Sequence, residues 1–231
     1  SPSGSNALAE QTLRQQSIEY ASCIAASKLN REAAYWAYWQ YYTPKVCFPV
    51  PALSLTKEQC DRIQSPAISA TLSKLHMNRN TARSVVFGPS QYGGLGLPAL
   101  YTSASIGQLR LLLGHLRLQD KTAKLILIDI SYIQLLVGSS SLFINTAYDK
   151  YYPLVDDSWL TSIWSFLSKI NMQLQIRQAF TPSPSRKNDQ SLTDLFVSLG
   201  YKPAELKRLN KCRVHLQVLY LSDIVSADGR T

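Results

Sequence analysis

The chain has 231 residues, of which 45% are hydrophobic and 17% charged, and its formal net charge is +9. This composition excludes a largely disordered chain, because there is ample apolar surface to bury and little charge repulsion to oppose collapse. The length allows one large domain or two small ones. The positive excess favours polyanionic partners if it gathers on one face, with simple solubility as the alternative.

The cysteines form no Cys-x-x-Cys pair and have no histidine at zinc-ligand spacing, so the sequence predicts neither a metal site nor a cofactor. We interpret them as buried thiols of an intracellular protein, in the nucleus or cytoplasm: Cys23, Cys47, Cys60 and Cys212. No N-terminal run has the pattern of a secretory signal. The most apolar stretch, residues 125–137, is shorter than the roughly 20 residues of a membrane span, so no membrane partner is expected.

The first two helices are predicted from caps and apolar spacing. Ser5 or Asn6 can cap a helix whose apolar positions run from Leu8 to Leu29. The chain begins without a start methionine, which suggests a fragment.

A second helix, residues 31–42, is dense in aromatic side chains. Tyr35, Trp39 and Tyr42 have the spacing of a core stripe, and the alternative is that exposed members stack on bases. Pro44 is expected to end this helix and begin an extended linker.

Thr56 and Gln59 form a capping box that starts the next helix, with Leu55 and Cys60 placed as its hydrophobic staple. We expect this helix to run toward Pro66 and a further helix to begin with Pro66 in its first turn. Two short alternating segments, residues 84–87 and residues 172–177, are the candidates for a small sheet.

The second half of the chain continues the helical pattern. Helical spacing predicts an apolar stripe on one helix, formed by Ile106, Leu109, Leu112, Leu113 and Leu116. Residues 125–137 favour a buried helix, with a strand as the alternative.

Three later helix ends are marked by their residue types. Asp157 is expected to cap one helix, Ser191 to begin another, and Gly200 to stop it. Pro203 starts a last helix. The apolar side predicted for that helix is formed by Leu206, Leu209, Cys212, Leu216 and Leu219. Because helical segments dominate the chain, the predicted fold class is mainly α, a multi-helix bundle with at most a small accessory β element.

Basic residues gather in two places. The first cluster, which also includes an asparagine, precedes a glycine-rich loop and consists of Lys74, Arg79, Asn80 and Arg83. The second lies on one side of the last helix, within roughly a quarter of its circumference, and consists of Lys207, Arg208 and Lys211. A basic stripe backed by an apolar stripe can pack on a domain while lying along a phosphate backbone, and a merely solvated face is the alternative. We predict that both clusters contact phosphates and form one continuous positive surface.

The glycine-rich loop contains Gly93, Gly94 and Gly96. Glycine can take positive φ and lets another backbone, or a phosphate, come close, which a side chain would prevent. The sequence therefore predicts a structural loop that presents backbone beside the arginines.

Three segments carry a family resemblance: Val-Val-Phe-Gly-Pro at 85–89 with Tyr-Gly-Gly-Leu-Gly-Leu at 92–97, Leu-Leu-Leu-Gly-His-Leu-Arg at 111–117, and Leu-Leu-Val-Gly-Ser-Ser at 135–140. Their order resembles the region downstream of the polymerase domain in reverse-transcriptase-like proteins of eukaryotic non-LTR-type retroelements. The resemblance implies a helical thumb-like segment at residues 1–76, a basic and glycine-rich loop at residues 77–100, and a helical C-terminal region at residues 101–231 whose role it does not decide.

The same resemblance implies a part that grips RNA or DNA, including an RNA–DNA hybrid, beside the polymerase domain of the same protein. Asp156 and Asp157 are not expected to hold catalytic metal ions, because helical spacing follows them and the polymerase motif lies in a β-hairpin. We therefore expect no catalysis by this chain alone. A helical protein-interaction module is the second hypothesis and an enzyme of unrecognised type the third, although His76, His115 and His215 lie in unrelated segments.

Overall fold

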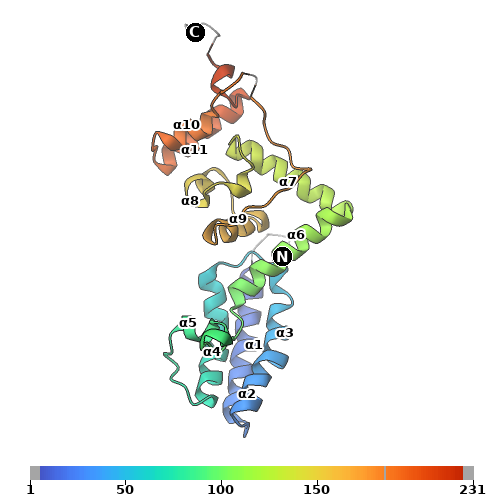
Figure 1. Cartoon of the computed structure of the whole chain (residues 1–231), viewed down its shortest axis with the longest axis vertical. Coiled ribbons are helices and arrows are strands. Elements are labelled where there is room, and N and C mark those ends of the chain that lie inside the picture. The colour runs from blue at the N-terminus through green and yellow to red at the C-terminus, as the bar shows by residue number, and fades with distance from the viewer. Residues whose placement is uncertain (1–5, 185, 226–231) are drawn as a thin grey trace. The chain divides into compact units, whose positions relative to one another are not determined.

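The computed structural model describes residues 6–184 and 186–225, and it confirms the mainly α-helical fold class (Figure 1). Ser5, one of the two candidate caps, and residues 226–231 lie outside these ranges. The chain divides at Leu111 into two compact units. The division falls inside the helix α6 (Leu100–Leu118).

The first unit is built around two long helices, α1 (Ala7–Ala26) and α4 (Lys57–Lys74), which run side by side (Figure 1). The predicted apolar positions Leu13, Tyr20 and Ile24 of α1 are buried between them and their neighbours. Asn6 precedes α1, but its side-chain amide donates to the Ser54 carbonyl at 3.0 Å and makes no capping hydrogen bond. The helix ends at Ala26, earlier than the predicted Leu29.

The aromatic helix differs from its prediction in both length and buried face. The α-helix α2 (Arg31–Ala37) continues through a π-helical turn, η1 (Tyr38–Tyr42), into α3 (Thr43–Cys47) and then the 3₁₀ turn η2 (Val50–Ala52). Pro44 therefore does not end the helix. It follows the π-helical turn, in which the Thr43 amide donates to the Tyr38 carbonyl, and this wider hydrogen-bonding pattern accommodates a residue that has no N–H.

The π-helical turn also changes which aromatics are buried. Tyr38 is fully buried and Tyr42 is buried, whereas Trp39 is 37% exposed and Tyr35 half-buried. The predicted stripe was thus right for Tyr42 and wrong for Trp39, because a turn with an extra residue shifts the helical phase that the prediction assumed.

The capping box of α4 is confirmed. The Gln59 amide donates to Thr56 Oγ1 at 3.3 Å, and the Thr56 amide donates to Gln59 Oε1 at 2.8 Å. Leu55 and Cys60 are both buried. The expected break at Pro66 does not occur, because the buried stripe of α4 continues across Pro66 and packs along α1 on either side of it.

Gln64 is a buried polar residue that joins three parts of this unit. Its Nε2 donates to the Tyr38 hydroxyl and to the Pro98 carbonyl, both at 2.6 Å, and its Oε1 accepts from the Leu100 amide at 3.0 Å. Because every polar atom of the side chain is paired, this burial avoids the cost of an unsatisfied group. Gln64 thereby fixes the start of α6 against α4.

Residues 84–87 were a candidate strand, and this prediction was wrong: they belong to the short helix α5 (Arg83–Phe87), followed by the 3₁₀ turn η3 (Ser90–Tyr92). Val86 and Leu97 are buried in the same core as α1 and α4. The glycine-rich loop between them is therefore packed into the first unit.

In the second unit, helix α7 (Lys121–Val137) is followed by η4 (Phe143–Asn145), α8 (Tyr148–Tyr151), η5 (Tyr152–Leu154) and α9 (Trp159–Lys169). Trp164 on α9 is fully buried, meets Phe143 edge to face at 5.3 Å between ring centroids, and donates to the Thr146 carbonyl at 2.8 Å. Of the stripe predicted on α6, Leu112 and Leu116 are buried, whereas Ile106 and Leu113 are exposed.

The second candidate strand, residues 172–177, is also not a strand. The Asn145 side chain accepts from the Leu174 amide at 2.8 Å and donates to the Leu174 carbonyl at 3.0 Å. A side-chain amide therefore takes the place that a neighbouring strand would have.

The remaining elements are α10 (Leu192–Ser198), α11 (Pro203–Leu216) and the 3₁₀ turn η6 (Leu221–Asp223). Ser191 caps α10, Gly200 has φ +73° after its last turn, and Pro203 is the first residue of α11, as predicted. A single antiparallel bridge between Ser191 and Tyr220 is the β pairing in the described residues.

Two predictions about cysteines and the membrane can be compared with the structure. Cys60 is buried and Cys47 half-buried, but Cys23 and Cys212 are exposed, so the prediction of four buried thiols was wrong for these two. Cys212 lies on the side of α11 that the apolar spacing predicted to be buried. Within the described ranges, no helix is long and apolar enough to cross a membrane.

Candidate nucleic-acid interface

The basic residues of the first unit differ in what they contact. Lys74 is half-buried, and its ammonium donates to the Ser27 carbonyl at 2.6 Å, just beyond the last turn of α1. A cation at this position also interacts favourably with the helix dipole. Lys74 therefore stabilises the end of α1, which the sequence did not indicate.

Arg79, Asn80 and Arg83 are exposed. The turn that carries Arg79 and Asn80 is held by Asn78, whose Oδ1 accepts from the Asn80 amide at 2.8 Å. Neither arginine forms an ion pair within the described residues. Both guanidinium groups are therefore open to a phosphate.

The glycine-rich loop uses its backbone donors internally. The amides of Leu95 and Leu97 donate to the carbonyls of Val85 and Val86 at 2.8 and 3.1 Å, and the Gly96 amide donates to the Gly88 carbonyl at 2.8 Å. These bonds satisfy carbonyls at the end of α5. The amides are consequently not free to hold a phosphate, and of the two partners that the sequence allowed, another segment of backbone is the one observed.

The three glycines are nevertheless required by geometry. Gly93 and Gly96 have φ of +80° and +68°, and a Cβ on Gly94 would lie 2.1 Å from the Gly88 carbonyl oxygen. The close backbone approach that the sequence predicted therefore occurs, but its partner is the chain itself.

In the second unit, α11 presents its cations outward. Lys207, Arg208 and Lys211 are exposed, and their side chains make no hydrogen bond or ion pair within the described residues. The buried face of the helix is formed by Leu206, Asn210 and Arg213, which share the spacing i, i+4, i+7. The predicted apolar side was right at Leu206 and wrong at Cys212 and Leu216, which are exposed. Its other members, Leu209 and Leu219, are half-buried.

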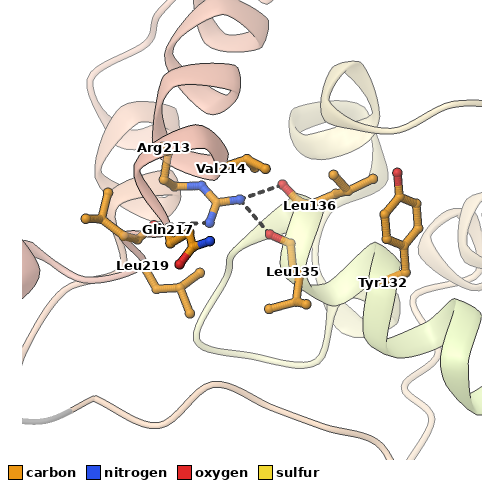
Figure 2. Close-up of a pocket in the computed structure, with 8 residues that line it drawn as sticks. Tyr132, Leu135, Leu136, Arg213, Val214, Gln217 and Leu219 are labelled. Atoms are coloured by element: carbon orange, nitrogen blue, oxygen red, sulfur yellow. Dashed lines mark hydrogen bonds between the residues drawn. The ribbon is translucent and has the colours of Figure 1, made fainter.

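Arg213 is a site residue that the sequence analysis missed. The residue is 3% exposed, and its guanidinium donates to the Leu135 and Leu136 carbonyls at 2.6 and 2.9 Å, at the end of α7 (Figure 2). It also donates to Asn210 Oδ1 at 2.8 Å, and Asn210 Nδ2 donates to the Leu136 carbonyl at 2.8 Å. These bonds fix α11 to α7, so the exposed cations stand on a rigid support.

Residues 135–140 contain the sequence feature that could have indicated a buried donor such as Arg213. A helix that ends in the interior needs donors for its last carbonyls, and Gly138, with φ +64°, marks such an end. A Cβ on Gly138 would lie 2.7 Å from the Arg213 guanidinium carbon. Desolvation lowers the pKa of Arg213 from 12.5 to about 10, which leaves the group charged at neutral pH.

The same segment is held from its other side by Asp194 on α10. Its carboxylate accepts from the Ser140 hydroxyl at 3.2 Å and from the Tyr151 hydroxyl at 2.7 Å. Residues 135–140, one of the three segments that carry the family resemblance, therefore join α7, α10 and α11. Burial raises the pKa of the Tyr151 hydroxyl.

A hollow of 410 Å³ lies beside the cations of α11. Lys207, Lys211 and His215 line it from α11, Tyr132 lines it from α7, and Asp156 lies between η5 and α9. Tyr132 is 61% exposed and projects from the helix turn that precedes Leu135 and Leu136 (Figure 2). The hollow thus combines two ammonium groups with an open aromatic ring.

The predicted cap of α9 is displaced by one residue. Ser158, and not Asp157, accepts from the Thr161 amide, at 3.2 Å, and completes a capping box. Asp156 and Asp157 are exposed, and the described residues contain no group of three metal-ligating side chains.

No family model, curated protein or solved structure matches this chain.

Proposed function

We propose that the chain is a nucleic-acid-gripping part of a reverse-transcriptase-like retroelement protein, and that it acts without a polymerase active site of its own. The observation that carries the proposal is the set of exposed, unpaired cations on α11, Lys207, Arg208 and Lys211, on a helix fixed by the buried Arg213. A rigid cationic helix loses little entropy when it contacts phosphates.

Arg79 and Arg83 extend the proposal to the first unit, where they flank an ordered turn beside the glycine-rich loop. Lys74 is a weaker candidate for phosphate contact, because its ammonium is already bound to the Ser27 carbonyl. The proposed partners are RNA or DNA, including an RNA–DNA hybrid, and the polymerase domain of the same protein. Such a part would act inside the cell, in the nucleus or cytoplasm.

The experiment is a binding titration of the chain against an RNA–DNA hybrid and a DNA duplex at about 50 and about 200 mM salt. Replacing Lys207, Arg208 and Lys211 by alanine should weaken binding to all sequences and reduce the salt slope by roughly one for each lost contact. Arg186→Ala with Lys187→Ala, in the loop before α10, is the control. Unchanged affinity and slope in the triple variant would refute the proposal.

A second candidate function, a helical protein-interaction module, is favoured by one observation. Helix α7 exposes an apolar face on which Leu125 is 65%, Ile128 63% and Leu135 43% exposed. Such a face is typical of an interaction surface. If the chain associates with itself through α7, analytical ultracentrifugation should show a concentration-dependent species that Leu125→Glu with Ile128→Glu removes.

A further inference from the structure

We infer that the hollow lined by Tyr132, Lys207 and Lys211 seats one unpaired nucleotide, with its base against the Tyr132 ring and its phosphate between the two ammonium groups. The inference rests on the proposed function and adds the substrate class: single-stranded nucleic acid, or a single-stranded extension of a duplex. The volume of 410 Å³ lies within the range of about 300–1,000 Å³ of small-molecule sites.

The two ends of the hollow have different chemistry. Lys207 and Lys211 are four residues apart on α11, so both ammonium groups lie on one face and border the hollow together. Asp156 also borders it, is exposed and forms no ion pair within the described residues, so it can accept hydrogen bonds from an exocyclic amino group or a sugar hydroxyl while repelling a phosphate. This charge distribution directs a phosphate to the α11 side.

Tyr132 provides the stacking surface. The ring stands on α7 and is 61% exposed, and α7 is held at its end by Arg213 and Asn210. An aromatic ring fixed on a rigid element is suited to stack on a base whatever its identity. A base inside a duplex already has neighbours on both faces, so the ring selects an unpaired one.

A neighbouring hollow of 260 Å³ is different in character. It is lined by Tyr132, Leu135 and Leu219, with Arg213 committed to backbone carbonyls, so it offers no free cation for a phosphate (Figure 2). The nucleotide is therefore assigned to the α11 side of Tyr132.

The test uses an oligonucleotide that carries one 2-aminopurine, whose fluorescence is quenched when it stacks on an aromatic ring, and a blunt duplex of the same sequence. Tyr132→Leu should weaken single-strand binding about tenfold and abolish the quenching, while Tyr132→Phe keeps both. Duplex affinity should be the same for the three proteins. Tyr92→Leu, at a tyrosine that is 82% exposed in the first unit, is the matched control.

A cationic control separates this inference from the proposed function. Lys207→Ala with Lys211→Ala should weaken binding to both oligonucleotides, whereas Lys121→Ala with Lys124→Ala, at exposed cations of α7, should not. If Tyr132→Leu binds single strands like the parent, or weakens single strand and duplex equally, the nucleotide seat is wrong while the proposed function stands. If the Lys207 and Lys211 variant also binds like the parent, both fail. Far-ultraviolet circular dichroism checks that each variant is folded.

Discussion

Arg213 has no carboxylate partner within the described residues, and its charge is balanced by dipoles instead. The Leu135 and Leu136 carbonyls belong to the last turn of α7, where the helix dipole is negative. A buried charge is costly unless its hydrogen bonds are made, and here the acceptors are helix-end carbonyls that have no partner within α7. The guanidinium therefore gains hydrogen-bond acceptors in the interior, and the carbonyls at the end of α7 gain a donor.

Arg213→Met should lower the free energy of unfolding of the second unit by roughly 2–4 kcal/mol, because it leaves the Leu135 carbonyl and Asn210 Oδ1 buried without their donor. Urea denaturation followed by the fluorescence of Trp159 and Trp164, with Trp36 and Trp39 of the first unit replaced by Phe in each protein compared, measures the change. Arg208→Met, on the exposed face of the same helix, should stay within about 0.5 kcal/mol of the parent. Equal stability of the two variants would contradict the role given to Arg213.

The buried tyrosines of the first unit predict sensitivity to alkali. Burial raises the pKa of Tyr38 and Tyr42 above the ordinary value of 10.0. The native state then holds these protons more tightly than the unfolded chain, so their contribution to stability is complete below pH 10 and decreases as the pH rises above it. Denaturant titrations at pH 8 to 11 should show this decrease, and Tyr42→Phe should reduce it. A flat profile in the parent would contradict the prediction.

At the scale of elements, the glycine-rich loop and α5 stabilise each other. The loop donates two amides to carbonyls of α5 and a third to the carbonyl of Gly88, which follows the helix, and the sequence positions that allow this are the glycines. Gly94→Ala should therefore be strongly destabilising, because its Cβ would lie 2.1 Å from the Gly88 carbonyl oxygen. Gly93→Ala meets nothing within 4 Å and should cost only about 1 kcal/mol for its positive φ. Thermal melting compares them, and similar melting temperatures would disprove the packing argument.

Helix ends could be predicted from the sequence because they depend on neighbours in the chain. Four residues occupy the helix start or end that their residue type predicted: Thr56, Ser191, Gly200 and Pro203. The predicted cap Asp157 was wrong by one residue, since Ser158 with Thr161 offered an equally local alternative. Local chemistry therefore located these five helix ends to within one residue, whereas the ends expected at Leu29, Pro44 and Pro66 were wrong.

Buried faces were predicted less well, because they depend on tertiary contacts. The π-helical turn at Tyr38–Tyr42 moved the aromatic stripe, and packing along α1 kept α4 continuous through Pro66 although proline costs a helix interior about 3 kcal/mol. Arg213 was overlooked for the same reason: its partners are carbonyls some 77 residues away in sequence. The sequence analysis identified the exposed cations of the candidate site but not the hydrogen bonds of Arg213 and Asn210 that hold α11 on α7.

At the scale of the whole molecule, each unit carries its own exposed cations, Arg79 and Arg83 in the first and Lys207 and Lys211 in the second. The continuous positive surface stays a prediction, and its functional consequence can be tested without assuming any arrangement of the units. Two modest sites on one chain bind a shared strand more tightly than either alone, because the first contact raises the effective concentration of the second.

We therefore expect the parent to bind a long strand roughly a hundredfold more tightly than either single-cluster variant, Arg79→Ala with Arg83→Ala or Lys207→Ala with Lys211→Ala. A strand of about 6 nucleotides engages one cluster at a time, so the loss from either variant should be much smaller, and only the fourfold variant should lose binding altogether. Fluorescence anisotropy with the two strand lengths at a fixed salt concentration measures both ratios. The same ratio for long and short strands would mean that the clusters act independently, because linkage through a shared strand must depend on its length.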